Sequence, residues 1–272
     1  MKSEVITSRD NSLLRLARSV RDGKTTESIF VEGLRLCEEA LRSGLSLEAV
    51  IVSQELAAKE KAALLLKELG SRSQRTAFVS EKLLESISYT KTPQGIILLA
   101  GRPSTNEAHF AANQNNPLIV VMHRINNPVN VGAILRTAEA AGASGAIATQ
   151  NTSDPFSPKA LRGAMGSAFR LPVWFGPTFS DAVSWCLLHD LQTVCADVHA
   201  TTGYDEVDWV KPSALILGPE SSGLSPVEIE AASAAVRIPM CEPAESLNVA
   251  VATGVLLYEA ARQRSSRRET TS

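Results

Sequence analysis

The chain has 272 residues, of which 44% are hydrophobic and 5% aromatic, and its formal net charge is −2. This length and apolar content fit two modest globular domains or one large one, and the near-neutral charge argues against nonspecific nucleic-acid binding by the chain as a whole. The N-terminus lacks the apolar core of a signal peptide, and the longest apolar stretch, residues 247–257, is too short to span a bilayer. We therefore expect a soluble cytoplasmic protein with no membrane partner.

Charge is unevenly distributed along the chain. Residues 1–103 carry 16 basic and 13 acidic side chains, a net charge of +3, whereas residues 104–272 carry 11 and 16, a net charge of −5. The four cysteines and four histidines show no metal-binding spacing, so we expect buried, reduced thiols and no metal site. Five cations near the N-terminus predict either a local basic face or an ordinary solvated helix: Arg9, Arg15, Arg18, Arg21 and Lys24.

Helical and strand patterns alternate over the first hundred residues, which predicts a small α/β domain at residues 1–103. Helices are expected where apolar residues recur at helical spacing, and Gly44 and Gly70 end two of them. The expected helices are Leu13–Val20, Leu34–Arg42, Glu55–Leu69 and Glu81–Ile87. The expected strands are Ser28–Val31, Ala49–Val52, Thr76–Val79 and Gly95–Leu99.

A polar segment with two prolines, residues 101–117, follows, and we assign residues 104–116 within it as a linker. Alternation then resumes over residues 117–264, which predicts an α/β domain with a mostly parallel sheet and helices on both faces. The polar tail, residues 265–272, is expected to be disordered. The expected strands are Leu118–Met122, Ala146–Ala148, Thr193–Ala196, Ala214–Leu217 and Ala235–Ile238. The expected helices are Val131–Ala141, Pro158–Ala168, Phe179–Leu188, Pro226–Ala232 and Leu247–Arg262.

Three segments at strand ends are rich in Gly, Pro, Ser and Asn. They are NNPVNVGAILRTA at residues 126–138, ALILGPESSGL at residues 214–224, and IPMCEPAESLNV at residues 238–249. Open α/β sheets bind ligands at the carboxyl ends of their strands. We therefore expect the three segments to form one composite site.

Residues 218–225, GPESSGLS, nearly match a phosphate-binding P-loop, but Leu224 stands where that motif needs Lys. Pro219 breaks the Gly-x-Ser-x-Gly pattern that a serine hydrolase would have around Ser221. No Gly-x-Gly-x-x-Gly opens a helix, so a dinucleotide site has no support. A P-loop-like nucleotide-binding protein stays an alternative on the spacing alone.

Single residues in these segments admit both a structural and a functional interpretation. If Asn130 caps the helix that follows, Arg136 lies less than two turns into that helix and could point toward the ligand edge. The Arg136 side chain could equally extend into solvent. Glu220, between two glycines, is either a ligand contact or a solvated carboxylate. Ser246 is a candidate N-cap of the last helix.

Taken together, the three segments resemble, in order and spacing, the motifs of the SpoU-type (TrmH-like) branch of the SPOUT RNA methyltransferases, over roughly residues 116–262. Residues 157–173, SPKALRGAMGSAFRLPV, resemble the segment that links the first two motifs. In the N-terminal half, FVEGLRLCEEALRSG and TPQGIILLA are similar to an L30e-like substrate-binding domain. The residues that match the three motifs are Asn130 and Arg136, then Gly218, Glu220 and Gly223, then Pro239, Ser246, Leu247 and Asn248.

The resemblance implies an S-adenosylmethionine-dependent methyltransferase that modifies a ribose 2′-hydroxyl in structured RNA, with rRNA favoured over tRNA. It also implies a C-terminal trefoil knot and a homodimer whose site is completed across the subunit interface. A non-catalytic RNA-binding module with a degenerate knot is the alternative. The implied catalytic and orienting residues are Arg136, Asn130, Glu220, Ser246 and Asn248. The implied cofactor-binding residues are Leu217, Gly218, Gly223, Ile238, Met240 and Leu247.

Overall fold

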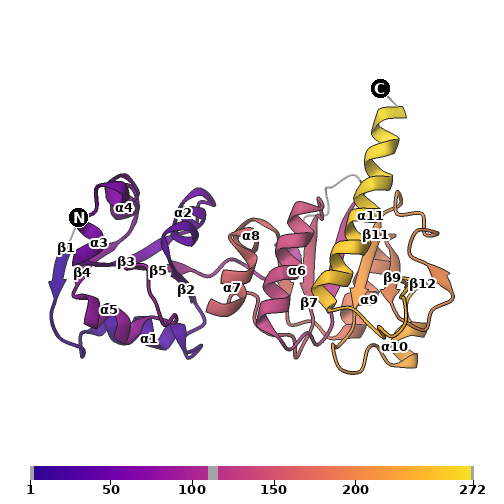
Figure 1. Ribbon diagram of the computed structural model, residues 1–272, viewed down its shortest axis with the longest axis horizontal. Coiled ribbons are helices and arrows are strands. Elements are labelled where there is room, and N and C mark those ends of the chain that lie inside the picture. Colours follow the sequence, from indigo (N-terminus) through magenta and orange to yellow (C-terminus); the bar gives the residue numbers. More distant parts are fainter. Residues whose placement is uncertain (1–2, 110–115, 271–272) are drawn as a thin grey trace. The chain divides into compact units, whose positions relative to one another are not determined.

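The computed structural model describes residues 3–109 and 116–270, and the chain divides into two compact units (Figure 1). The N-terminal unit comprises Met1–Pro103 together with Phe156–Arg170. The C-terminal unit comprises Ser104–Pro155 and Leu171–Ser272. Residues 110–115, which belong to the predicted linker, lie outside the described residues, and Glu107–His109 form a short 3-10 helix.

The N-terminal unit is built on a five-stranded mixed sheet in the order β1-β4-β3-β5-β2. Strands β1, β4 and β3 are parallel, while β5 runs antiparallel to β3 and β2. Strand β1 was not predicted, because its four residues, two polar followed by two apolar, lack the alternation that signals a strand and gain their pairing only from the neighbouring β4. The strands are β1 (Ser3–Ile6), β2 (Ser28–Glu32), β3 (Leu47–Ser53), β4 (Arg75–Val79) and β5 (Ile96–Gly101).

Helices α1 and α5 pack on one face of this sheet, where Leu14, Leu84 and Ile87 join strand residues in a continuous core. Asn11 caps α1, as its side chain accepts from the Leu13 amide at 2.8 Å. The helices of the unit are α1 (Ser12–Arg21), α2 (Leu34–Arg42), α3 (Gln54–Ala57), α4 (Glu60–Arg72), α5 (Glu81–Ile87), α7 (Pro158–Ala164) and α8 (Ser167–Arg170).

Two predicted helices are each divided in the structure. The helix expected over Glu55–Leu69 is α3 followed by α4, because Lys59 is extended. Gly70 does not end α4; it is buried inside the helix and has no left-handed φ. The helix expected over Pro158–Ala168 breaks between α7 and α8, where Met165 and Gly166 have φ values of 49° and 97°.

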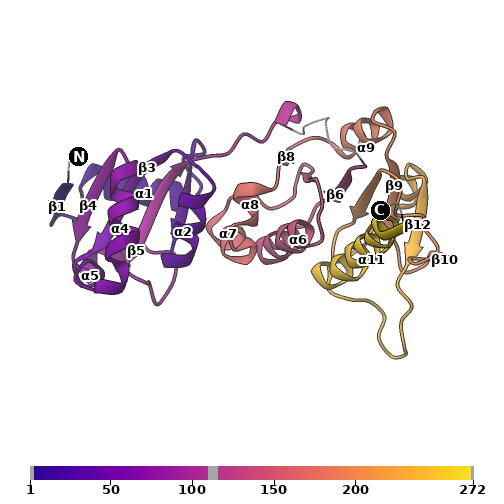
Figure 2. The same ribbon diagram turned by 90° about the horizontal axis from the view of Figure 1, so that it is seen from above.

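The C-terminal unit is built on a seven-stranded sheet, and every pairing among its described strands is parallel. Helix α9 covers one face and helices α6 and α11 cover the other (Figure 2). The predicted mostly parallel α/β sheet with helices on both faces is therefore confirmed. The strand order is β10 (Thr202–Gly203), β12 (Ala234–Arg237), β9 (Gln192–Ala196), β11 (Ser213–Leu217), β6 (Leu118–Met122), β7 (Gly145–Ala148) and β8 (Val173–Phe175).

The four helices described in the C-terminal unit differ from expectation mainly at their ends. Helix α6 begins at Pro128, and α11 continues to Thr270, into the segment for which disorder is predicted. The Arg264 guanidinium, which donates to carbonyls including that of Trp209 at 2.7 Å, anchors this last stretch. Residues 271–272 lie outside the described residues. The helices are α6 (Pro128–Ala140), α9 (Phe179–Leu188), α10 (Pro226–Glu230) and α11 (Val249–Thr270).

The strand order shows that the chain re-enters the middle of its own sheet. Strand β11 lies between β9 and β6, and β12 lies between β9 and β10, although both come after the strands that flank them. The chain then returns from β12 to pack α11 against α6, the first helix of the sheet. Knots are rare because chains seldom thread their own loops. This order is compatible with a trefoil knot, which stays a prediction.

The cysteines match the expected reduced, buried thiols at three of four positions. Cys37, Cys186 and Cys195 are free and buried, and Cys241 is free and exposed. Burial raises the pKa of Cys186 to about 12 and that of Cys195 to about 11, so both thiols are protonated and unreactive at neutral pH.

Among the helices that the structure describes, none combines the length and the apolar character that a membrane span requires.

We expect Glu32→Gln to lower the stability of the N-terminal unit. The Glu32 carboxylate is 8% exposed and accepts from the amides of Tyr89 and Thr90 at 2.9 and 3.2 Å and from the Thr90 hydroxyl at 2.6 Å. A neutral carboxamide could keep both amides on its oxygen and donate to the Thr90 hydroxyl, but it replaces hydrogen bonds to a charged group with weaker neutral ones, at a cost of about 1–3 kcal/mol in the free energy of unfolding. Urea unfolding would measure it, with exposed Glu27→Gln as the control; equal midpoints for both variants would contradict the prediction.

Candidate functional site

The three polar segments singled out in the sequence follow strands of the C-terminal sheet. Residues 123–127 follow β6, residues 218–225 follow β11, and residues 238–248 follow β12. Because these strands are parallel, their carboxyl ends lie at one edge of the sheet. The amide of His123 donates to the carbonyl of Leu217 at 2.9 Å, which continues the pairing of β6 with β11 up to the start of the two loops.

The first and third segments meet through two asparagines. Asn248 caps α11, since its side-chain oxygen accepts from the amides of Ala250 and Val251 at 2.9 and 3.4 Å. The Asn248 amide group donates to the Asn130 side-chain oxygen at 3.3 Å. Asn130 is buried, and within the described part of the chain its own Nδ2 has no hydrogen-bond partner. An unpartnered buried donor at this edge is available to a ligand or a partner chain.

Two predicted capping roles are wrong. Asn127, not Asn130, caps α6, and its side chain accepts from the Val129 amide at 3.0 Å. Asn248, not Ser246, caps α11. In both cases the sequence offered two polar residues near the helix start, and the backbone conformation, which depends on the neighbouring loop, selected one of them.

Because Asn127 caps α6, Arg136 lies further along the helix than the sequence predicted. Arg136 is the ninth residue after Asn127, so it lies about 13 Å along the axis from the start of α6 rather than less than two turns in. Its side chain is exposed, and no hydrogen bond or ion pair of the Arg136 guanidinium occurs with the residues that the structure describes. The guanidinium therefore remains free to bind a group from outside this chain's own fold.

The segment after β11 is a tight turn with an exposed rim. Leu217 is buried, whereas Glu220 and Gly223 are exposed. Gly218 is needed for the close approach, because a Cβ there would lie 2.8 Å from both Cγ and N of Leu224. Leu224 itself is buried in the core. A phosphate-binding P-loop needs a lysine that reaches out at this position, so the geometry gives the P-loop alternative no support.

The segment after β12 presents a small apolar surface beside polar side chains. Ile238 and Met240 are half-buried, Leu247 is 38% exposed, and Ser246 is exposed. Half-buried aliphatic side chains at a strand end suit a flat apolar ring, and free backbone groups around them suit its polar edge. Metal binding has no such support, since no group of three or more potential ligands occurs among the described residues.

The sequence interpretation missed a polar cluster formed by His123, Thr149 and Glu228 at the same edge. The Nε2 of His123 lies 2.9 Å from a carboxylate oxygen of Glu228, and its Nδ1 lies 2.9 Å from the Thr149 hydroxyl. Arg124 also donates to Glu228, at 2.9 Å. Glu228 forms a capping box with Ser225 at the start of α10. The Ser-x-x-Glu spacing signals that box in the sequence, but its bond to a histidine 105 residues away does not.

Both members of the central bond in this cluster have shifted pKa values. Burial lowers the pKa of His123, and this outweighs the opposite effect of Glu228. Partial burial would raise the pKa of Glu228, but hydrogen bonds from Ser225 and the nearby His123 and Arg124 hold it below its usual value. A neutral imidazole that donates from Nε2 to the carboxylate and accepts the Thr149 hydroxyl at Nδ1 satisfies all three groups. The cluster thus ties the end of β6 to the far end of residues 218–225.

Comparison with protein families places both parts of the chain. Residues 117–258 match the SpoU rRNA Methylase family, and residues 13–98 match the MRM3-like substrate binding domain. The first match contains all three of the polar segments described above. The second match lies within the five-stranded N-terminal unit.

Similar proteins extend over nearly the whole chain. An uncharacterized tRNA/rRNA methyltransferase of Synechocystis sp. is 32% identical over 95% of this chain and 93% of its own length. The 23S rRNA (uridine(2479)-2'-O)-methyltransferase of Streptomyces viridochromogenes is 28% identical, with 92% and 88% covered. The crystal structure of an AdoMet-bound rRNA methyltransferase from Sinorhizobium meliloti superposes with a TM-score of 0.85 at 30% identity, covering 96% of this chain and 98% of that one.

We expect His123→Gln to flatten the pH dependence of stability between about pH 5 and 7.5. Because the pKa of His123 is lowered on folding, the unfolded chain binds more protons in this window, and the wild type loses stability as the pH falls. Glutamine can still donate to Glu228 but does not titrate. Denaturant midpoints at several pH values would measure the effect, with the exposed His199→Gln as the control. The same slope in the wild type and both variants would show that His123 does not carry it.

Proposed function

The chain belongs to the SpoU rRNA methylase family, and from this premise we propose that it transfers a methyl group from S-adenosylmethionine to a ribose 2′-hydroxyl of structured RNA. The proposal is carried by one observation: the three motif segments lie at one edge of a parallel sheet. The Asn248–Asn130 hydrogen bond joins the first of them to the third. The named 2'-O activity of the Streptomyces relative supports ribose as the acceptor. We favour cytoplasmic rRNA over tRNA, since two similar proteins are named for rRNA.

The residues at this edge fit the proposed cofactor. The adenosine needs an apolar cradle with backbone groups at its rim, and Ile238, Met240 and Leu247 would supply the apolar part. Leu217, whose side chain is buried, would support this surface from the core. Gly223, with a φ of 64° and open space beside it, leaves the backbone accessible, whereas Gly218 lets the turn close onto Leu224 and so shapes the loop. When bound, S-adenosylmethionine supplies a methyl group already activated by its sulfonium. Ser246, Asn248 and Glu220 are the polar side chains that would orient the loops around it.

Arg136 is the residue that we propose positions the RNA. Its planar guanidinium can hold the phosphate next to the target ribose through two parallel hydrogen bonds. Correct placement of a weak nucleophile can contribute roughly 7–11 kcal/mol to catalysis. A guanidinium does not give up its proton at neutral pH, so we assign positioning rather than base catalysis to Arg136. The hydroxyl proton would leave late, to water or a nearby oxygen.

The position of Arg136 favours a homodimer. Arg136 lies about two and a half turns from the start of α6, so a second copy is the natural source of the loops that face it. Val129 on α6 and Val251 and Tyr258 on α11 are between 43% and 55% exposed. Apolar side chains that are exposed together on two packed helices often mark a surface that a partner covers. We propose that these helices form a two-fold interface and that Arg136 acts on the site of its partner.

We expect Arg136→Ala to reduce methyl transfer at least about 100-fold, which corresponds to roughly 3 kcal/mol of lost transition-state stabilisation. The affinity for S-adenosylmethionine, measured by titration calorimetry, should be unchanged. Tritium transfer to ribosomal RNA from cells that lack the gene measures the rate, with exposed Arg42→Ala as the control. Wild-type turnover in Arg136→Ala would refute the role of Arg136.

Alkaline hydrolysis of the tritiated RNA identifies the methylated atom. A methylated 2′-hydroxyl cannot attack the neighbouring phosphate, so label should appear in alkali-resistant dinucleotides. Label in mononucleotides would indicate base methylation instead. Cofactor binding by the wild type without transfer to any cellular RNA would favour the non-catalytic RNA-binding alternative.

We expect a mixed dimer to recover activity that neither parent variant has. In a dimer of one Arg136→Ala chain and one Gly218→Val chain, one composite site keeps both an intact Arg136 and an intact cofactor loop, so about half of the wild-type activity should return. Valine at position 218 would clash with Leu224 and distort the loop. Two affinity tags allow the mixed dimer to be purified. No recovery would mean that each Arg136 serves its own chain.

A further inference from the structure

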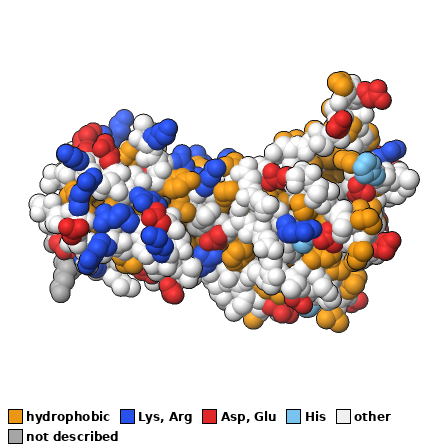
Figure 3. Space-filling model, turned by 90° about the horizontal axis from the view of Figure 1, so that it is seen from below, with side chains coloured by type: hydrophobic (Ala, Val, Ile, Leu, Met, Phe, Trp, Pro, Cys, Tyr) orange, Lys and Arg blue, Asp and Glu red, His pale blue; other side chains and the backbone are white. Residues whose placement is uncertain are grey.

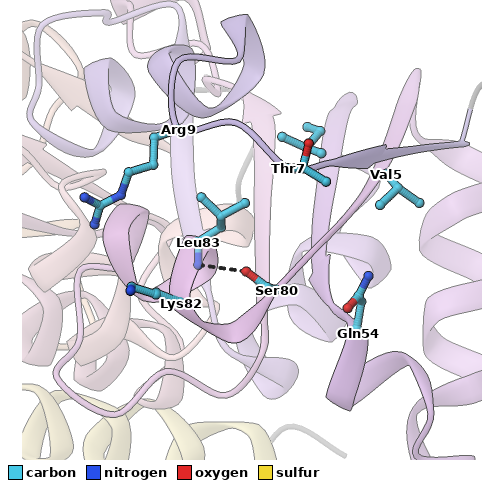
Figure 4. Close-up of a pocket in the computed structure, with 8 residues that line it drawn as sticks. Val5, Thr7, Arg9, Gln54, Ser80, Lys82 and Leu83 are labelled. Atoms are coloured by element: carbon cyan, nitrogen blue, oxygen red, sulfur yellow. Dashed lines mark hydrogen bonds between the residues drawn. The ribbon is translucent and has the colours of Figure 1, made fainter.

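A pocket of about 490 Å³ lies in the N-terminal unit, outside the site described above (Figure 4). Its volume falls within the roughly 300–1,000 Å³ typical of small-ligand sites. The register of the sheet creates it: Ile6 pairs with Val79, and Val79 pairs with Ser53, so three parallel strands end in one row. The residues that line the pocket are Val5, Ile6, Thr7, Arg9, Gln54, Ser80, Lys82 and Leu83.

The lining combines two cations with neutral polar groups and with the apolar side chains of Val5, Ile6 and Leu83. In the view of Figure 4, the Arg9 and Lys82 side chains extend toward the same side of the pocket, and Val5 and Gln54 lie across from them. None of the eight described lining residues is acidic. Four carboxylates flank lining residues in the sequence. Glu4 pairs with Arg75, Glu55 pairs with Lys59, and Glu81 accepts from the Glu55 amide at 3.1 Å, while Asp10 is exposed.

The surroundings of the pocket are also basic. Lys and Arg side chains gather on the face of the N-terminal unit seen in Figure 3. Of the five cations predicted to form a basic face, Arg9, Arg15 and Lys24 are exposed. The other two are engaged, as Arg18 donates to the Arg9 carbonyl at 2.8 Å and Arg21 pairs with Asp22. The Arg18 bond fixes the backbone that carries Arg9 into the pocket.

From this lining we propose that the pocket binds one unpaired nucleotide of the RNA substrate. Arg9 and Lys82 hold its phosphate, the aliphatic side chains of Val5 and Leu83 contact the face of its base, and Gln54 reads the edge of the base. Recognition of RNA through nucleotides splayed out of a loop uses this combination of charge, apolar contact and amide hydrogen bonds. The proposal rests on the proposed RNA-modifying function and adds to it a place where the substrate is selected.

A charge-removal variant tests the phosphate contacts in the full-length protein. We expect Arg9→Ala/Lys82→Ala to weaken binding of in vitro transcribed 23S rRNA about tenfold at 0.1 M salt and to reduce the slope of log affinity against log salt by about 0.7, the value for one phosphate contact to a single strand. The matched control is Lys61→Ala/Lys67→Ala, which removes two exposed cations from α4, a helix that does not line the pocket. Equal slopes for the wild type and the pocket variant would overturn the proposal.

A second variant separates nucleotide binding from folding. Gln54→Glu places a carboxylate at the first position of α3, where a negative charge favours the helix, so the thermal midpoint should not fall. The added charge should nonetheless weaken RNA binding, because it faces the phosphate pocket. Undiminished RNA affinity in Gln54→Glu would count against the assignment.

Crosslinking locates the bound nucleotide independently of methyl transfer. Irradiation of the wild type with a 4-thiouridine hexanucleotide should label peptides that contain residues 5–9 or 80–83, and should label them less in Arg9→Ala/Lys82→Ala. The hexanucleotide should also bind more tightly than uridine monophosphate, since neighbouring phosphates add contacts. Labelling confined to other peptides, or equal affinity for the monophosphate, would overturn the proposal. These readouts remain valid even if the enzyme proves not to methylate ribose.

Discussion

The packing of α11 against α6 holds the candidate active site together. These helices begin at loops that follow different strands, and their sequence positions are more than a hundred residues apart. Asn248 both caps α11 and donates to the buried Asn130 of α6, and Gly254 lies against Thr137 further along. The last segment of the chain is therefore fixed to the first helix of the sheet, and the loop at residues 238–248 must cross the carboxyl edge to reach it.

The polar groups at the carboxyl edge of the C-terminal sheet are of two kinds, those with hydrogen-bond partners within the described part of the chain and those without. The His123–Glu228 pair is buried and fully hydrogen-bonded, so it stabilises the framework around residues 218–225. Arg136, Glu220 and Ser246 are exposed, and the described part of the chain offers them no hydrogen-bond partners. Exposed groups without internal hydrogen bonds can bind a charged polymer directly. Groups that are already hydrogen-bonded within the protein would first have to break those bonds, which lowers the affinity for the ligand.

In the N-terminal unit, too, a candidate binding site lies at the carboxyl ends of parallel strands. Its strands β1, β4 and β3 are parallel, and the residues that directly follow them line a basic pocket. Carboxyl ends of parallel strands gather loops at one edge whatever the fold family. The chain thus carries two such edges, one with the motif residues to which we assign methyl transfer as a proposal and one with cations suited to a phosphate.

The sequence by itself determined most elements, the two-part organisation and the motif residues, because hydrophobic periodicity and Gly, Pro and Ser signals act over a few residues. It did not determine β1, the ends of α6 and α11, or the bond between His123 and Glu228. Three of these depend on a partner distant in the chain: β4 for β1, Trp209 for the end of α11, and α10 for His123. The start of α6 depends instead on the loop conformation that makes Asn127 its cap. Only the tertiary structure brings such partners together, since a short strand or a buried histidine gains stability from packing and hydrogen bonds that no local pattern encodes.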